Sequence, residues 1–219
     1  RNLDSQKLAF EMANVASDRG TVILEDTQFL KFMRYNENGE ICGVITSSGA
    51  ILADSIVVAA GYDSKKIIND LGLRVPFLPL KSYTVDFPAS LIKANLPYTL
   101  SLQDMSLTLT QLGDTCKLSG CFDIDGPENI EINESRVEFL TKKLKSILRN
   151  MDQPQNETPR AAIFSLTSDD MPIVGSLPYT NNIYLNSGHG KRGAASILGA
   201  SKLLADQITE KIDKNNQTL

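Results

Sequence analysis

The segment Ile51-Leu52-Ala53-Asp54-Ser55-Ile56-Val57-Val58-Ala59-Ala60-Gly61 carries the strongest fold signal in the 219-residue chain. Its second half is apolar at consecutive positions, so both faces of the strand it would form are apolar. A strand of this kind is buried on both sides, as in a parallel sheet covered by helices. The segment therefore predicts an α/β fold with a parallel sheet, and places Gly61 at the end of a strand.

The residues before this strand predict a helix followed by a β-meander. Asp4 or Ser5 can cap a helix whose apolar residues follow the 3.6-residue period, and Gly20 ends it. Strand-like runs follow at residues 21–25, 29–35 and 41–47, and the last two flank a hairpin turn.

The sequence changes character near residue 75, where glycine and proline residues mark an expected domain boundary. Residues 81–87 and 105–112 alternate apolar and polar side chains, and a Gly-Asp turn leads into residues 115–123. This pattern is typical of an antiparallel sheet with one face in water. Residues 134–149 predict a helix, because they carry an apolar stripe with acidic residues early and basic residues late.

The last third of the chain holds a glycine-rich loop, Gly188-His189-Gly190-Lys191-Arg192-Gly193, between a strand at residues 182–187 and a helix from Ala194. The loop matches the dinucleotide fingerprint G-x-G-x-x-G. That fingerprint needs a second parallel strand after the helix, and only a short polar tail follows Ile212. The helix N-terminus still attracts a phosphate or an electron-rich oxygen. A plain tight turn into a helix is the alternative interpretation.

Composition and charge argue against several function classes. Apolar residues make up 42% of the chain and charged residues 22%, as in an ordinary globular protein. The net charge is −4 and the longest basic cluster is Lys142-Lys143-Leu144-Lys145, which argues against nucleic acid as the main partner. No apolar run approaches the roughly 18 residues that a transmembrane helix needs.

Three cysteines and one histidine leave few ways to build a metal site. Cys116 and Cys121 are five residues apart in a predicted strand, a spacing that points them to opposite faces. A zinc site formed by these two with Cys42 and His189 lacks the paired spacing of such sites. We therefore expect no metal, and free thiols in a reducing compartment.

Four motifs carry a resemblance to a known family. They are ADSIVVAAG at residues 53–61, VPFLPLKSYT at 75–84, DDMPIVG at 169–175 and YLNSGHG at 184–190. In this order they resemble the FAD-dependent D-amino acid dehydrogenases, within the wider D-amino acid oxidase and glycine oxidase superfamily. Members of that family are substantially longer and begin with a β-α-β unit, so the chain resembles their C-terminal portion. We expect Arg1 to mark an interior cut.

The resemblance implies a partial FAD-binding Rossmann-like domain that lacks its N-terminal βαβ unit and carries an inserted antiparallel substrate-binding domain. Residues 1–74 and 164–219 would form the FAD-binding part, and residues 75–163 the substrate-binding part. A missing N-terminal segment or subunit is then an expected partner. The cofactor-binding residues that the resemblance implies are Ala60, Gly61, Gly175, Ser187, Gly188, His189, Gly190, Lys191, Arg192 and Gly193.

The implied reaction is hydride transfer from the Cα atom of a D-amino acid to the flavin, which gives a 2-oxo acid and ammonia after hydrolysis. Electrons would pass on to an acceptor such as a quinone. The catalytic candidates are His189, Tyr83 and Lys81. Alternation puts Lys81 and Tyr83 on one face of a strand, where a cation and a phenol can meet a carboxylate. An exposed pair on the wet face is the alternative, and His189 is equally consistent with a turn residue held by a structural hydrogen bond.

One position departs from the family pattern. Relatives carry an Arg-Pro pair shortly before the turn at Asp169-Asp170, and the matching position here is Phe164, which cannot clamp a carboxylate. Arg160 would substitute only if the chain shifts. The expected substrate is therefore an amine or an amino acid.

A noncatalytic subunit or pseudoenzyme that serves as an interaction scaffold is the alternative function. A binding protein for another small anion is a third possible function. The expected location is cytoplasmic, with peripheral membrane attachment left open.

Overall fold

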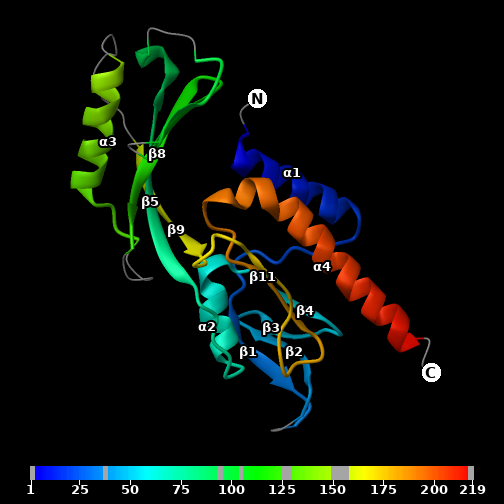
Figure 1. The fold of residues 1–219 in the computed structure, drawn as a ribbon. Helices are drawn as coiled ribbons and strands as arrows, with labels where there is room; N and C mark the ends of the chain where they lie inside the picture. Colours follow the sequence, from blue (N-terminus) through cyan, green and yellow to red (C-terminus); the bar gives the residue numbers. More distant parts are fainter. Residues whose placement is uncertain are drawn as a thin grey trace. The chain divides into compact units, whose positions relative to one another are not determined.

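The computed structural model describes residues 3–36, 39–92, 96–103, 106–124, 130–148 and 158–216. The chain divides into two compact units (Figure 1). Unit 1 consists of Arg1–Gly20 and Pro79–Ile163, and unit 2 of Thr21–Leu78 and Phe164–Leu219. Helices and several separate sheets occur together, so the fold is of the mixed α/β type that the sequence predicts.

Unit 1 is built on a five-stranded sheet with the strand order β6-β7-β8-β5-β9. The pairs β5/β8, β6/β7 and β7/β8 are antiparallel, as the alternating pattern predicts. Its strands are β5 (Leu78–Pro88), β6 (Leu100–Leu102), β7 (Leu107–Leu112), β8 (Thr115–Asp123) and β9 (Thr158–Leu166).

Two helices belong to unit 1, and both begin at a side-chain cap. Helix α1 (Ser5–Asp18) begins after Asp4, whose carboxylate accepts the N–H groups of Gln6 and Lys7. Helix α3 (Glu134–Ile147) begins after Asn133 and lies along β8 (Figure 1). The apolar stripe of α3 joins a core formed by Tyr83, Val85, Phe87, Ile92, Leu107, Leu109, Cys116, Leu118, Leu140 and Leu144.

A β-bulge interrupts the pairing of β5 with β8 beside Tyr83. Ser82 pairs with Phe122 and Tyr83 with Gly120, so Cys121 is the extra residue. The backbone of Cys121 lies in the left-handed region at φ +52°, which costs roughly 1–2 kcal/mol for a residue other than glycine. Bulges bend a strand and re-aim its side chains, and beyond this one Asp123 stands opposite Lys81.

Unit 2 contains two three-stranded sheets. The first is an antiparallel meander, and in the second β4 pairs parallel to β11. Helix α4 (Gly193–Asn216) contacts β10 and β11, and a short helix α2 (Ser64–Asn69) follows β4. The strands are β1 (Phe29–Arg34), β2 (Ile41–Thr46) and β3 (Gly49–Leu52) in the first sheet, and β10 (Ile173–Ser176), β11 (Ile183–Ser187) and β4 (Ile56–Val58) in the second.

Two predicted strands differ in the structure. Residues 21–25 form no strand, and Val22, Ile23 and Leu24 are exposed, because no neighbouring strand among the described residues pairs with them. The predicted strand at residues 51–61 is divided between β3 and β4, which belong to different sheets. Val57, in the middle of β4, is 44% exposed, so the expected burial on both faces is wrong for the described residues.

The compact units also divide the chain differently from the predicted domains at two places. Residues 75–78 fall in unit 2, although the sequence boundary joins them to the antiparallel sheet. Residues 1–20 group with the antiparallel sheet of unit 1, although the sequence boundary joins them to the following meander. Helix α1 has no buried residue, so the pattern of its side chains does not predict which unit it belongs to. Met105 and Arg149, predicted to begin a strand and end a helix, lie outside the described residues. No helix in the described part of the chain is long and apolar enough to cross a membrane.

Candidate functional site

The parallel strands β4 and β11 end side by side in unit 2, and their carboxyl ends carry several predicted cofactor residues. Ser187, the last residue of β11, donates its hydroxyl to the carbonyl oxygen of Gly61 at 2.7 Å. The preceding Ala60 donates its N–H to the hydroxyl of Ser64 at 3.1 Å. In α/β proteins, ligands bind outside the carboxyl ends of parallel strands. The structure therefore brings Ala60, Gly61 and Ser187 to the edge where a ligand is expected.

Gly61 leaves its backbone open to a ligand. Its φ is +58°, a conformation that favours glycine, and a Cβ atom added there would have no heavy atom within 4 Å. The glycine is therefore not needed to accommodate a neighbouring side chain of the protein. A ligand can approach this backbone more closely than it could approach any other residue type.

In the loop after β11, glycine is required at two positions because neighbouring side chains leave no room for a Cβ atom. A Cβ atom on Gly188 would lie 2.8 Å from Cε1 of Phe77, and one on Gly190 would lie 2.6 Å from Oδ1 of Asp170. The Gly188 N–H also donates to the hydroxyl of Ser165 at 3.2 Å. These two glycines make room for side chains of the chain itself, which fixes the path of the loop into α4.

His189 is held through both nitrogens of its imidazole ring. Nε2 lies 2.8 Å from Oδ1 of Asn186, and Nδ1 lies 3.1 Å from the hydroxyl of Ser196. Asn186 donates its amide to Ser201, so its oxygen faces the histidine. Burial lowers the pKa of His189 below its ordinary value of 6.5, so the ring is neutral at pH 7. This geometry agrees with the structural-hydrogen-bond interpretation, and a catalytic role for His189 stays a prediction.

The loop is also tied to the turn before β10. Arg192 Nε lies 3.2 Å from Oδ2 of Asp170, while Oδ1 of Asp170 is buried without a hydrogen-bond partner among the described residues. Lys191 and Arg192 stand just before α4, where positive side chains oppose the helix dipole. A bound anion would offset that unfavourable charge. Gly175, the remaining predicted cofactor residue, lies inside β10 opposite Leu185.

The second group of predicted site residues lies in unit 1 on β5. Lys81 and Tyr83 are 2% and 1% exposed, so the alternative of an exposed pair on the wet face is wrong. The Lys81 ammonium lies 5.4 Å from the centre of the Tyr83 ring, which agrees with the shared face that alternation predicts. A buried cation and phenol on one face can serve a ligand or the core, and their catalytic role stays a prediction.

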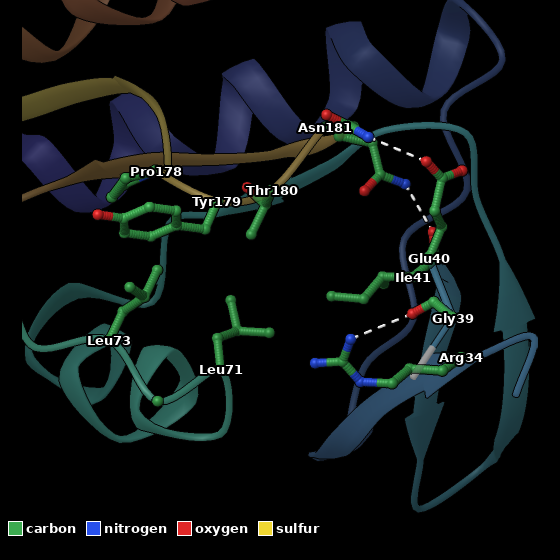
Figure 2. Close-up of a pocket in the computed structure, with 12 residues that line it drawn as sticks. Arg34, Gly39, Glu40, Ile41, Leu71, Leu73, Pro178, Tyr179, Thr180 and Asn181 are labelled. Atoms are coloured by element: carbon green, nitrogen blue, oxygen red, sulfur yellow. Dashed lines mark hydrogen bonds between the residues drawn. The ribbon is translucent and has the colours of Figure 1, made fainter. Parts of the chain in front are cut away.

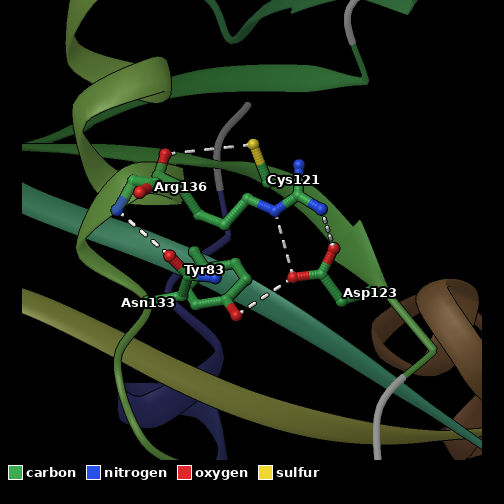
Figure 3. Close-up of polar contacts among 6 residues, drawn as sticks. Tyr83, Cys121, Asp123, Asn133 and Arg136 are labelled. Carbon is green, nitrogen blue, oxygen red and sulfur yellow. Dashed lines mark hydrogen bonds and ion pairs between the residues drawn. The ribbon is translucent and has the colours of Figure 1, made fainter.

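Sequence reasoning missed Asp123, which binds Tyr83, and Arg136, which binds Asp123 (Figure 3). The Tyr83 hydroxyl donates to Oδ2 of Asp123 at 3.1 Å, and Arg136 binds the same carboxylate through Nε at 3.2 Å and Nη2 at 2.5 Å. Asp123 in turn raises the pKa of Arg136 above its usual range. No sequence signal pairs these residues, because the bulge at Cys121 sets the register that brings them together.

The three thiols are free, and they are not grouped for a metal. Cys42 lies in unit 2, whereas Cys116 and Cys121 lie in unit 1, and burial raises the pKa of both of the latter. Within the described ranges, no cluster of three His, Cys, Asp or Glu side chains is arranged to hold a metal ion.

Neither Phe164 nor Arg160 offers a free positive charge for a substrate carboxylate in the described structure. Phe164 in β9 is 38% exposed and offers no charge. Arg160, four residues earlier, forms an ion pair with Asp86 of β5. Its guanidinium is already committed to a carboxylate within unit 1.

Comparison with known proteins now identifies the family. A family model described as FAD dependent oxidoreductase, DAO, matches residues 1–207. The chain belongs to this family of FAD-dependent oxidoreductases. It is 26% identical over 206 residues to a D-amino acid dehydrogenase of Paramagnetospirillum magneticum, and 30% identical over 175 residues to one of Vibrio cholerae. These alignments cover 94% and 79% of the chain, and 48% and 41% of the relatives, so the chain spans about half the length of the curated relatives it matches.

Two solved structures share the fold. Glycine oxidase from Geobacillus kaustophilus superimposes with a TM-score of 0.81 at 18% identity, over 93% of this chain and 53% of the oxidase. Iminodiacetate oxidase from Chelativorans superimposes with a TM-score of 0.76 at 23% identity, over 93% and 54%. FAD is the cofactor of the family. The open backbone of Gly61 at the carboxyl edge fits one side of such a cofactor site.

Proposed function

We propose that this DAO-family chain supplies one side of the flavin site and the substrate-binding unit of an FAD-dependent dehydrogenase that oxidises a D-amino acid or a related amine. The observation that carries the proposal is the carboxyl edge of β4 and β11, where Gly61 leaves its backbone open and the chain turns into α4. The D-amino acid dehydrogenase relatives support the substrate class.

In the proposed site, residues of this chain bind and orient the cofactor. Gly61 admits a phosphate-bearing group close to its backbone, and the loop at residues 188–193 presents the positive N-terminal end of α4. Ser187 holds the two strand ends together through Gly61. FAD, when bound, would supply the hydride acceptor.

Unit 1 would carry the groups that recognise substrate. Lys81 places a buried positive charge on β5, suited to a carboxylate, and Tyr83 packs beneath it with its hydroxyl fixed by Asp123. His189 would position the loop through Asn186 and Ser196. The imine product would hydrolyse in water to a 2-oxo acid and ammonium, and the electrons would leave to an acceptor such as a quinone.

The proposal also assigns a partner to the open edge of β4. In the described part of the chain, β4 is an edge strand of its sheet, and Val57 is partly exposed. An edge strand offers unpaired backbone groups that another strand can use. We expect the remaining part of a flavin-binding domain, from a preceding segment or a separate subunit, to pair there.

The test uses the complete gene product that contains this chain. It should purify with visible flavin absorbance, or gain it on addition of FAD, and D-amino acids should bleach that absorbance under anaerobic conditions. A colourless protein that cannot be reconstituted with FAD would contradict the proposal.

A noncatalytic scaffold is the second candidate function. Phe164 in place of the expected arginine favours it, as does the engagement of both His189 ring nitrogens by neighbouring side chains. The same experiment separates the two functions, because a scaffold would show no bleaching with any member of a panel of D-amino acids and amines.

A further inference from the structure

A cleft of about 490 Å³ lies in unit 2 (Figure 2). Its wall includes Asn182, which directly precedes β11, whereas Ser187 ends that strand. Five residues of extended chain span about 16 Å, so the cleft and the candidate flavin edge are separate places on one sheet. All of its lining residues belong to unit 2.

One wall of the cleft continues the apolar core of unit 2. Ile41 is a buried member of that core, and Leu71 and Leu73 pack against it. In Figure 2 the side chains of Ile41 and Leu71 point toward one another across the space. A ligand seated there would bury its apolar body against the existing core.

A cation stands at the edge of this apolar wall. Arg34 pairs with Ile41 across the β1/β2 ladder after a register shift between Met33 and Arg34, so both side chains lie on the same face of the sheet. Bulges re-aim side chains in this way. Among the described residues, the side chain of Arg34 makes one hydrogen bond, from Nη1 to the carbonyl oxygen of Gly39 at 3.2 Å, and forms no ion pair.

Two other polar side chains of the cleft are engaged within the protein. Glu40 accepts the side-chain amide of Asn181 at 2.9 Å, and Thr180 donates its hydroxyl to the carbonyl of Leu177. Figure 2 shows Glu40 on the Asn181 side and the Arg34 guanidinium at the other end of the same wall. Arg34 is therefore the charged donor with capacity left for a ligand.

An exposed aromatic ring completes the rim. Tyr179 is 99% exposed, and its backbone lies in the left-handed region at φ +60°. A tyrosine in that conformation carries strain that an asparagine or glycine would lessen. Figure 2 shows the ring beside Pro178 on the Leu73 side of the cleft, where it can cover the body of a ligand.

We propose that this cleft binds a small apolar monocarboxylate, with the carboxylate on the Arg34 guanidinium and the apolar body between Leu71, Leu73 and the Tyr179 ring. The assignment follows from a guanidinium that makes a single hydrogen bond among the described residues and stands beside an apolar wall. It does not depend on the proposed function, because the cleft shares no residue with the candidate flavin edge.

The test measures binding of 4-phenylbutyrate to the chain by calorimetry, with 4-phenylbutylamine as the ligand of opposite charge. Arg34→Gln should weaken binding of the carboxylate about tenfold or more, as expected on losing a charge-assisted hydrogen bond. Lys31→Gln, an exposed charge on the same strand outside the cleft, should leave it unchanged. Tyr179→Asn removes the ring at a backbone conformation that asparagine tolerates, and should weaken binding about threefold or more.

Three results would overturn the inference. They are equal binding by wild type and Arg34→Gln, binding of the amine as tight as that of the carboxylate, and a loss that follows Lys81→Gln instead of Arg34→Gln. The last result would place the carboxylate in unit 1. Flavin binding by the complete gene product is a separate readout, so failure here leaves the proposed function standing.

Discussion

The neutral state of His189 makes the stability of the chain depend on pH. Burial lowers its pKa in the folded state below 6.5, whereas the unfolded chain takes up a proton near that ordinary value. The unfolded state therefore binds more protons as the pH falls below 6.5, so stability decreases there and is retained above it. Urea unfolding measured from about pH 7.5 to about pH 5, an interval that spans this ordinary value, should show the free energy of unfolding decrease.

His189→Gln supplies the control, because His189 is the single histidine of the chain and glutamine does not titrate. The variant should lose most of the pH dependence in this window, since carboxylates titrate mainly at lower pH. An unchanged pH profile in the variant would show that other groups are responsible.

Tyr83 and Asp123 should contribute to stability as a coupled pair. Their hydrogen bond is reinforced by Arg136, and Tyr83 is buried in the unit 1 core. We expect Tyr83→Phe and Asp123→Asn each to lower the free energy of unfolding by about 0.5–3 kcal/mol, because the first removes one hydrogen bond to the carboxylate and the second removes the charge that binds Arg136. Combined in a double-mutant cycle of urea denaturation, they should show coupling of at least about 0.5 kcal/mol. Simple additivity would contradict the pairing.

At the same scale, the site was predictable only where it depends on local alternation. The shared face of Lys81 and Tyr83 follows from a spacing of two residues in a strand. The contact of Tyr83 with Asp123 depends on an extra residue at Cys121, and no pattern of apolar and polar residues reveals a bulge. The cleft beside Arg34 could not be predicted for the same reason. A register shift between Met33 and Arg34 places Arg34 opposite Ile41.

At the scale of elements, the pairing of β2 with β3 requires glycine at position 43. A Cβ atom there would lie 2.1 Å from the carbonyl oxygen of Ile51, a backbone atom that can move only with the strand. Gly43→Ala should therefore destabilise the chain by more than about 2 kcal/mol through overpacking. Gly199→Ala is the matched control in α4, where a Cβ meets nothing within 4 Å, and it should stabilise by about 0.5–1 kcal/mol. Equal effects of the two changes on the melting temperature would contradict this account.

Elements with strong local signals were predictable, and elements that depend on distant partners were not. The cap at Asp4, the alternation of β5 and β8 and the stripe of α3 each depend on residues a few positions apart. Residues 21–25 have the composition of a strand and yet form none in the described structure, since strand formation needs a pairing neighbour. The same residues leave an apolar surface exposed in unit 2.

At the scale of the whole molecule, the chain holds two compact units and about half the length of its curated relatives. The four ordered motifs predicted the family, because they place chemically restricted residues at strand ends and turns. The assignment of helix α1 to a unit could not be predicted, since none of its side chains is buried.

The central claim is that the carboxyl edge of β4 and β11 meets the flavin, and the affinity of the complete gene product for FAD tests it through two alanine variants. Gly61 and Gly113 both have positive φ, +58° and +60°, and neither Cβ would meet an atom within 4 Å. Both variants therefore introduce the same backbone strain. Fluorescence titration should show FAD affinity weakened about tenfold or more in Gly61→Ala and unchanged in Gly113→Ala. Equal affinity of the two variants would contradict the account.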